Sequence, residues 1–320
     1  MRVFVTGSTG FVGTAVVTEL LSAGHTVVGL TRSDAGVAQL ENLRSKGAAV
    51  EPLRGTLDDL DLLRRTAAAS DAVLHLAYNH DDFSRYAEAC AADRAAIGAL
   101  ASALGGTAKP LVITSATTGL LSPDGPDAPG TEADTADPSH PWSALRSQSE
   151  QLVRALAAHP DPTQSVRAMI VRLPPTAHGP GSSGFMSVLV GAALRHGGQA
   201  AYVGDGRNAW SACHRDDAAR LYRLIMEKGR AGAAYHAVGE EAVPVRDLAE
   251  AIGARLGRPA ISIQPDQVKA HYGWFGFAGA NQTASSAKTR EELAWNPTGP
   301  TVVEDTPIIV DFIKAHGSIL

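Results

Sequence analysis

The chain has only two cysteines, Cys90 and Cys213, and few aromatic residues, 5% of 320. Two cysteines so far apart give neither a disulfide framework nor a cysteine metal cluster. No apolar run reaches the roughly 18 residues of a membrane-spanning helix, and the chain opens on a strand pattern rather than a signal peptide. A formal net charge of -5 provides no broad basic surface for nucleic acid or anionic membranes. We therefore expect a cytoplasmic enzyme whose partner is a small molecule, with no metal, nucleic acid or membrane bound.

A glycine motif at the start of the chain is its most informative feature. The apolar segment 2–6 runs directly into Gly7, Gly10 and Gly13, and a helical pattern over 11–21 follows. Glycines at this spacing permit a tight turn, let the backbone approach a pyrophosphate and let the helix pack close to the strand. The helix N-terminus then offers N–H donors and a positive dipole to the phosphates. The motif in this setting predicts a dinucleotide site.

The end of the next strand, 26–31, indicates which dinucleotide is bound. An acidic residue there would bind the ribose hydroxyls of NAD, whereas an arginine would neutralise the 2′-phosphate of NADP. The sequence has Arg32 and Ser33 at this point. Asp34 follows, and it is the competing residue because it would reach a ribose if the loop folded back. We favour NADP(H) as the cofactor.

Strands alternate with helical patterns in the first half of the chain, which is typical of a parallel sheet with crossover helices. We expect an α/β fold, a doubly wound parallel Rossmann sheet with a smaller C-terminal α/β substrate lobe. The cofactor domain should span 1–175 and the substrate lobe 176–320, with exchange of segments between them left open. The loop over 121–141 is rich in proline, glycine and aspartate and should be exposed and mobile. The expected strands are 2–6, 26–30, 48–52, 72–77, 110–114 and 166–173, and the expected helices are 11–22, 35–46, 59–68, 83–104 and 142–158.

The order of several short motifs resembles the short-chain dehydrogenase/reductase superfamily, in its extended and atypical branch of NAD-dependent epimerase/dehydratase-like proteins. These motifs lie at 6–13, 73–77, 112–115, 172–174, 178–181, 204–206, 214–219 and 286–293. The resemblance implies a Rossmann core, hydride chemistry at a nicotinamide and, as in related folds, a possible homodimer. The cofactor-binding residues that follow are Gly7, Thr9, Gly10, Phe11, Val12, Gly13, Arg32, Ser33, Leu76, Ala77, Thr114 and Pro174.

The chain departs from this superfamily at the catalytic pair. Its enzymes usually carry Tyr-x-x-x-Lys on the helix after the mobile loop, and the corresponding positions here are Trp142 and Arg146. An indole does not titrate usefully and a guanidinium holds its protons, so this pair does not run the usual proton relay. Arg146 would bind cofactor ribose or a substrate oxyanion, or would be a solvated or ion-paired helix residue. Asp93 stands where an asparagine is common, either beneath the active site or exposed on its helix.

Other groups must therefore hold the substrate oxygen and supply the proton. Ser115 or Thr117 fits the upstream hydroxyl, although each is also a candidate turn cap. Tyr78 and His80 follow the strand at 72–77, whose carboxyl end faces the expected cleft, and bound water competes with both. Two further histidines are candidates, His178 in a turn where relatives often have tyrosine and His214 at a helix start, where structural hydrogen bonds are the alternative.

The second half of the chain offers an aromatic set that is either ordinary core or the lining of an apolar substrate site: Phe185, Met186, Tyr202, Trp210, Tyr272, Trp274, Phe275 and Phe277. The leading hypothesis is an NADP(H)-dependent oxidoreductase that moves hydride to or from a small, mostly apolar carbonyl, imine or activated alkene. Ser115 or Thr117 and Arg146 would polarise the acceptor. The alternatives are a sugar-nucleotide epimerase or dehydratase and a non-catalytic NADP-binding sensor.

Overall fold

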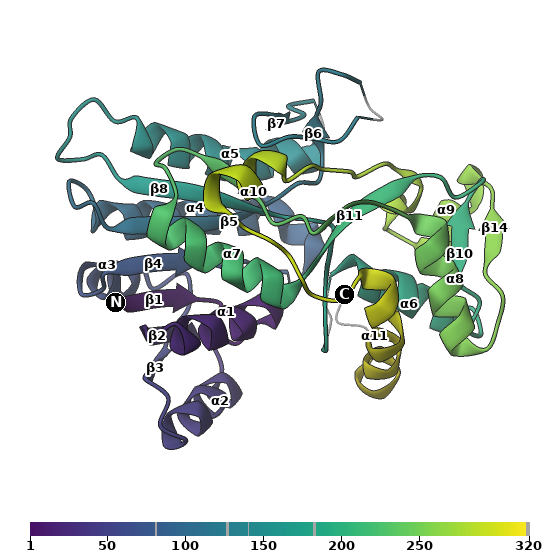
Figure 1. Ribbon diagram of the computed structural model, residues 1–320, viewed down its shortest axis with the longest axis horizontal. Helices are drawn as coiled ribbons and strands as arrows, with labels where there is room; N and C mark the ends of the chain where they lie inside the picture. The colour runs from purple at the N-terminus through teal and green to yellow at the C-terminus, as the bar shows by residue number, and fades with distance from the viewer. Residues whose placement is uncertain (81, 126–127, 140, 182–183, 318–320) are drawn as a thin grey trace.

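The larger part of the molecule is built on a seven-stranded parallel sheet (Figure 1). The computed structural model describes residues 1–80, 82–125, 128–139, 141–181 and 184–317. The strand order is β12-β8-β5-β4-β1-β2-β3, and every neighbouring pair is parallel. The expected Rossmann architecture is confirmed. The strands are β1 (Arg2–Thr6), β2 (Thr26–Thr31), β3 (Val50–Arg54), β4 (Ala72–His75), β5 (Pro110–Ala116), β8 (Arg167–Leu173) and β12 (Ala234–His236).

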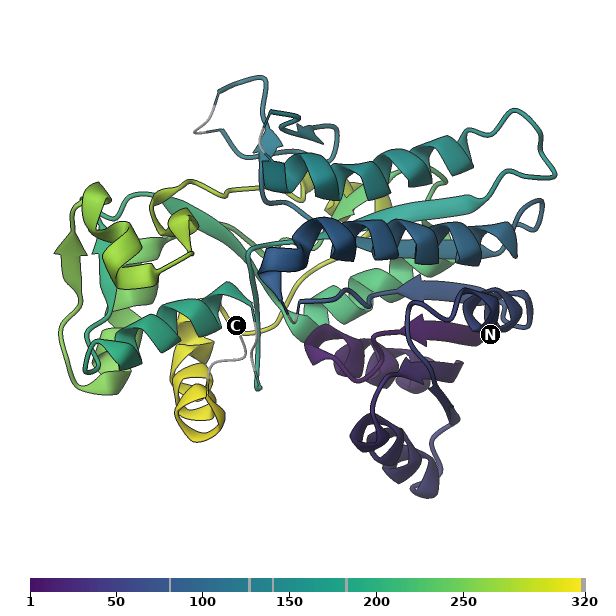
Figure 2. The same cartoon turned by 180° about the vertical axis from the view of Figure 1, so that it is seen from behind.

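Helices cover both faces of this sheet, which is why its inner strands β1, β4 and β5 are largely apolar. One face carries α1 (Phe11–Ser22) and α7 (Arg215–Lys228), and the other carries α3 (Leu60–Ala68), α4 (Tyr86–Ser102) and α5 (Pro141–Ala157) (Figures 1 and 2). α2 (Asp34–Ser45) packs on β3, and α10 (Ala287–Leu293) packs beside α7 and β12. The chain order reverses between β1 and β4, so a ligand crevice is expected at the carboxyl ends of these strands.

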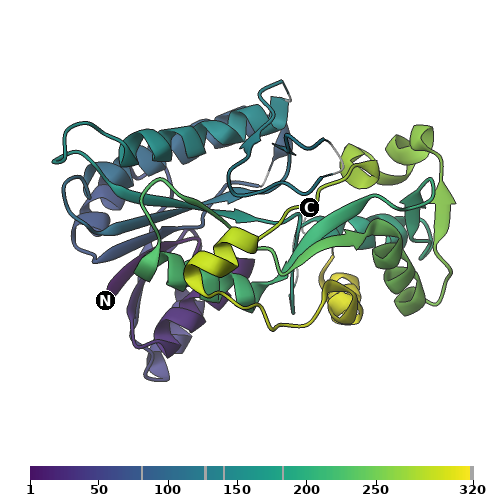
Figure 3. The same ribbon diagram turned by 45° about the horizontal axis from the view of Figure 1, so that its top comes forward.

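A second, smaller unit lies beside the first along the long axis of the molecule, and β11 runs between the two (Figure 3). Its sheets are β13-β11-β9 and β10-β14. These comprise β9 (Thr176–His178), β10 (Ala201–Val203), β11 (Ala209–His214), β13 (Glu240–Pro244) and β14 (Ile261–Ile263). The helices are α6 (Phe185–Arg195), α8 (Val245–Leu256), α9 (Val268–Tyr272) and α11 (Val302–His316), with short 3-10 turns η2 (Pro265–Gln267) and η3 (Gly276–Gly279). α7 and β12 lie well beyond residue 175, so segments from the second half of the chain complete the first sheet.

The loop that the sequence predicts to be exposed and mobile is anchored in part. It contains a small hairpin, β6 (Leu120–Leu121) with β7 (Thr135–Ala136). Glu132 is 5% exposed, and its Oε1 accepts hydrogen bonds from the backbone N–H and the hydroxyl of Thr289 at 2.8 and 2.7 Å. Thr131, Ala133 and Thr135 are exposed as expected, but the buried Glu132 carboxylate ties this segment to α10.

Much of the aromatic set in the second half of the chain is core rather than pocket lining. Trp210 and Phe275 are fully buried, and Tyr272 is 2% exposed, in the apolar core of the smaller unit. Trp274 is half exposed. A unit of this size needs large side chains to fill its interior, and the aromatic residues serve that need first. No helix within the described ranges is long and apolar enough to cross a membrane.

Candidate functional site

The glycine loop forms a close-fitting cradle at the carboxyl end of β1. Gly7 has a φ of +69°, and a Cβ on it would lie 2.8 Å from the backbone nitrogen of Ala77. A Cβ on Gly13 would lie 1.9 Å from the carbonyl oxygen of Gly7. No side chain caps the N-terminus of α1 at Gly10, which leaves backbone N–H groups of the first helical turn to bind an anion. These residues fit a dinucleotide pyrophosphate.

The loop after β2 presents two arginines. Arg32 is exposed, and Arg54 at the end of β3 donates to the carbonyl oxygen of Arg32. Asp34 lies in the first turn of α2, and its carboxylate is held 3.1 Å from Arg54 Nε. The Ser33 hydroxyl accepts from the backbone N–H of Gly36 and so caps α2. The carboxylate that competes with Arg32 is thus partnered by a second arginine.

Asp93 is the centre of a buried polar cluster between α4 and α5. Its Oδ2 accepts from Arg146 Nη1 and from Ser149 Oγ, both at 2.6 Å. Its Oδ1 lies 3.3 Å from His75 Nε2. Burial opposes the charge, but the Arg146 guanidinium and the His75 and Ser149 hydrogen bonds lower the pKa of Asp93 to about 2. Asp93 is therefore a carboxylate beneath the site, and not an exposed helix residue.

The protons in this cluster are ordered by the ionised carboxylate. Because the ionised Asp93 only accepts, His75 Nε2 donates to it, and in a neutral imidazole Nδ1 is left to accept. The Thr6 hydroxyl, 2.8 Å away, is the donor to Nδ1, while Thr6 Oγ1 itself accepts from the N–H of Ala77 at 3.2 Å. This chain of hydrogen bonds connects Thr6, the residue before Gly7, to Asp93, the counterion of Arg146.

Arg146 is held on three sides. Besides Asp93, its Nη2 donates to the carbonyl oxygen of Thr114 at 2.5 Å, and its Cζ lies 4.4 Å from the centroid of the Tyr78 ring. The Tyr78 hydroxyl lies 3.2 Å from Cys90 Sγ, and burial raises the pKa of this phenol. Arg146 is thus an ion-paired residue inside the site and not a solvated one, and Tyr78 is placed to hold it.

Trp142 and Arg146 face a matching row on α4. Tyr86, Cys90 and Asp93 lie at i, i+4 and i+7 on that helix, which puts them on one face. The Tyr86 hydroxyl donates to the carbonyl oxygen of Trp142 at 3.0 Å, and the two rings lie 4.5 Å apart. The sequence analysis did not identify Tyr86 or His75 as site residues. The helical spacing of Tyr86, Cys90 and Asp93 is a signal that could have identified Tyr86.

The two candidate hydroxyls after β5 differ in their surroundings. Ser115 is 5% exposed, and its hydroxyl forms a hydrogen bond with Glu150, whose pKa is lowered chiefly by the adjoining Arg172 against the effect of burial. Thr117 is 4% exposed, and its Oγ1 has no hydrogen-bond partner among the described residues. A buried hydroxyl without a partner costs about 1–3 kcal/mol, so a ligand oxygen that bonds to it gains from the contact.

The remaining predicted residues gather at the same edge of the sheet. His80 is exposed in the loop after β4, with its ring 4.8 Å from that of Tyr78. The Thr114 hydroxyl donates to the carbonyl oxygen of His75 at 2.9 Å. The structure therefore brings the carboxyl ends of β1, β4, β5 and β8 together around the predicted positions Gly7, Thr9, Gly10, Phe11, Val12, Gly13, Leu76, Ala77, Thr114, Ser115, Thr117 and Pro174.

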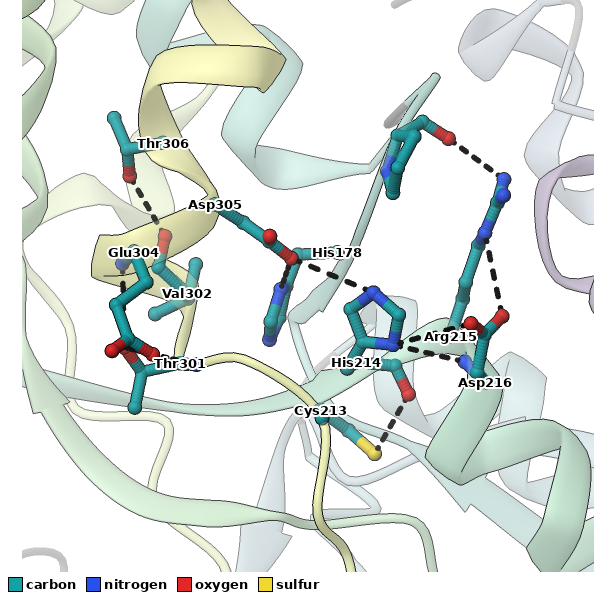
Figure 4. Close-up of polar contacts among 12 residues, drawn as sticks. His178, Cys213, His214, Arg215, Asp216, Thr301, Val302, Glu304, Asp305 and Thr306 are labelled. Carbon is teal, nitrogen blue, oxygen red and sulfur yellow. Dashed lines mark hydrogen bonds and ion pairs between the residues drawn. The ribbon is translucent and has the colours of Figure 1, made fainter.

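Two histidines lie apart from this edge, under the N-terminal end of α11 (Figure 4). His178 is fully buried, with Nδ1 2.7 Å from Asp305 Oδ2 and Nε2 3.7 Å from Glu240 Oε2. Burial opposes its charge, but Asp305 and Glu240 raise the pKa of His178. His214 accepts from the N–H of Asp216 and caps α7, and its Nε2 lies 3.7 Å from Asp305. These contacts fasten α11 to β9 and β11.

Raising the pH should weaken this attachment. A histidine whose pKa is higher in the folded chain stabilises the fold fully below its unfolded pKa of about 6.5, and loses that contribution as the pH rises through the folded pKa. We expect the free energy of unfolding in urea to decline above about pH 6.5 in the wild type and to decline less in His178→Asn. His316→Asn, at the exposed end of α11, should keep the wild-type decline. Equal declines in all three proteins would contradict this assignment.

Comparison with known proteins gives concordant results. The model of the NAD dependent epimerase/dehydratase family matches residues 3–238. An uncharacterized protein of Schizosaccharomyces pombe is 42% identical over 307 residues, covering 95% of this chain and 98% of that protein. The 2-alkyl-3-oxoalkanoate reductase of Stenotrophomonas maltophilia is 28% identical over 274 residues, covering 82% of this chain and 77% of that protein. A dTDP-glucose 4,6-dehydratase structure from Streptomyces venezuelae, with NAD bound, aligns at a TM-score of 0.76 and 23% identity over 99% of this chain and 98% of that one.

Proposed function

Because the chain belongs to the NAD-dependent epimerase/dehydratase family and is an NAD(P)-dependent enzyme of the short-chain dehydrogenase/reductase type, we propose that it is an NADP(H)-dependent reductase of small, mostly apolar carbonyl compounds. When bound at the glycine loop, a nicotinamide cofactor would provide hydride for the carbonyl carbon, and the residues of the site must bring a proton to the carbonyl oxygen. The residues at the carboxyl edge of the sheet bind the carbonyl oxygen, place positive charge beside it and deliver the proton.

The observation that carries this proposal is the Thr117 hydroxyl. It is buried directly after β5 without a partner in the described part of the chain, whereas the Ser115 hydroxyl is engaged by Glu150. A hydroxyl in this state is ready to donate to a substrate oxygen as negative charge develops there. Thr117 therefore binds the carbonyl oxygen in this proposal, and Ser115 orients α5.

Arg146 supplies the positive charge near the acceptor. Its contacts with Asp93 and Thr114 use two of the five N–H donors of a guanidinium and fix its position. The Tyr78 ring supports it from one side. Since burial raises the pKa of the Tyr78 phenol, we assign the proton delivery to His80 or to water and the support of Arg146 to Tyr78.

The substrate class follows from charge. A sugar nucleotide would need cations for its diphosphate, yet three arginines of the smaller unit are each paired with a carboxylate: Arg207 with Asp205, Arg246 with Glu250 and Arg255 with Asp311. The relative from Stenotrophomonas maltophilia is named for reduction of an oxoalkanoate, a ketone on an apolar chain. Together these features favour a carbonyl on an apolar skeleton over a nucleotide sugar.

The pairing of Asp34 with Arg54 supports NADP(H) over NAD(H), because it engages the carboxylate that would otherwise reach a ribose and leaves Arg32 exposed in the same loop. Replacing Arg32 by alanine should raise the KM for NADPH about 10- to 100-fold, as expected for loss of a charge-assisted contact with phosphate. The KM for NADH should stay within about twofold. Steady-state kinetics with both cofactors measures this, with Arg44→Ala on the outer side of α2 as the matched control. Equal effects on the two cofactors would contradict the assignment.

The test of the function is transfer of label. The protein is incubated with NADPH deuterated at its transferable position and with pooled ketones and aldehydes, and products that gain one deuterium are sought by mass spectrometry. Thr117→Val should reduce labelling at least 100-fold, while Thr118→Val should not. Labelled ketone products support the proposal. Binding of NADPH without any labelled product would overturn it in favour of a sensor, and tight binding of nucleotide-diphosphate sugars would favour an epimerase or dehydratase.

A further inference from the structure

Arg215 is a cation at the unfavourable end of a helix. It is the first residue of α7, and the aligned peptide dipoles make that end of the helix positive. The next two residues, Asp216 and Asp217, are the acidic ones that a helix start normally favours. A guanidinium placed against the helix dipole indicates that something other than helix stability determines this residue.

The guanidinium points away from the two histidines and toward the N-terminal segment of the chain (Figure 4). Its Cζ lies 5.3 Å from the centroid of the Phe11 ring, and its Nη1 donates to the carbonyl oxygen of Pro180 at 2.7 Å. Nε is buried and has no hydrogen-bond partner among the described residues; its nearest charge is Asp216 Oδ1 at 3.7 Å. Arg215 thus bridges the turn after β9 and the first turn of α1.

α1 and α7 lie side by side and run in the same direction. Arg215 meets Phe11 at one end, and Glu19 pairs with Arg223 at 2.6 Å further along. Their positive ends are therefore neighbours. At the N-terminal end of α1, the backbone N–H groups of the glycine cradle have no side-chain cap. Two helix dipoles and one arginine converge where the pyrophosphate of a dinucleotide would lie.

We propose that Arg215 is a cofactor-binding residue whose guanidinium contacts the pyrophosphate held at the glycine loop. The charge of the diphosphate offsets the unfavourable position of Arg215 on α7. Through Pro180, the contact also draws the turn after β9 toward the cofactor. This inference rests on the proposed binding of NADP(H), and it does not depend on the reaction proposed.

The test compares Arg215→Met, Arg215→Lys and the control Arg223→Met, which removes an arginine two turns further along α7. NADPH binding is measured by titration calorimetry, and 2′-AMP, which lacks a pyrophosphate, is measured by competition. We expect Arg215→Met to weaken NADPH binding about 10- to 100-fold, Arg215→Lys to weaken it less and Arg223→Met to change it less than twofold. The affinity for 2′-AMP should be unchanged in all three. The ligand-free Arg215→Met protein should melt no earlier than the wild type.

Wild-type NADPH affinity in Arg215→Met, or an equal loss for NADPH and 2′-AMP, would overturn the proposal. Failure of the reductase assignment is a separate result, since it appears as absent label transfer while the calorimetric loss in Arg215→Met persists. A wild-type protein that bound no dinucleotide would overturn the cofactor site itself.

Discussion

Replacing Asp93 by asparagine should reduce the free energy of unfolding by about 3–5 kcal/mol, because it leaves the buried Arg146 guanidinium without its counterion. Asp93 is 1% exposed and Arg146 16% at the side chain, so solvent replaces little of the lost charge. Activity should fall about 100-fold or more, since a small displacement of Arg146 misplaces the cation beside the acceptor. Urea unfolding and the label-transfer rate measure the two effects.

A double variant separates the effect of the unpaired Arg146 charge from the effect of the altered side chains. Asp93→Asn combined with Arg146→Met removes both charges, and it should recover much of the lost stability while remaining inactive. The wild-type pair also has a defined pH response. A carboxyl whose pKa is lowered to about 2 stabilises the fold above its unfolded pKa of about 3.9 and loses this contribution as the pH falls through about 2. Wild-type stability in Asp93→Asn would refute the central role given to this ion pair.

The sequence predicted the first half of the fold well, because local signals dominate there. The glycine loop and the apolar runs gave β1, α1 and β2 almost to the residue, with α1 found at Phe11–Ser22 as expected. β12 was not predicted. Only three residues long, Ala234–His236 shows too little periodicity to be recognised, and its place beside β8 depends on α7 packing against α1. Contacts of that kind are tertiary and leave no local pattern.

The sequence identified many residues of the site but not the hydrogen-bond and ion-pair partners of these residues. Arg146 was identified from the sequence, but its partner Asp93 lies on another helix. Which side chains meet across two helices cannot be inferred from the sequence of either helix alone. Arg54 is a similar case. The register of β2 with β3 sets Arg54 opposite Thr31, and this places it beside Asp34. The resemblance to the epimerase/dehydratase family supplied what residue patterns did not, and the match over 3–238 confirms it.

Arg172 should be the most costly single arginine to remove. It is fully buried, and its five N–H donors all have acceptors. Nε and Nη2 donate to Glu150 at 2.9 and 2.6 Å, and Nη1 lies 3.1 Å from His236 Nε2. The carbonyl oxygens of Asp134 and Thr131 accept the other two at 2.9 and 3.5 Å. Arg172 therefore connects β8, α5, β12 and the anchored loop.

We expect Arg172→Met to lower the free energy of unfolding by about 3–5 kcal/mol, because Glu150 is then left buried and charged. The change should also speed proteolysis within 122–139, since two carbonyl anchors of that loop are lost. Arg255→Met is the matched control: its pair with Asp311 is also bidentate but nearly half exposed, so its loss should change the stability much less than the loss of Arg172. Combining Arg172→Met with Glu150→Met should restore part of the stability but not the protection of the loop. Recovery of both would mean that Glu150, and not the backbone carbonyls, determines where the loop lies.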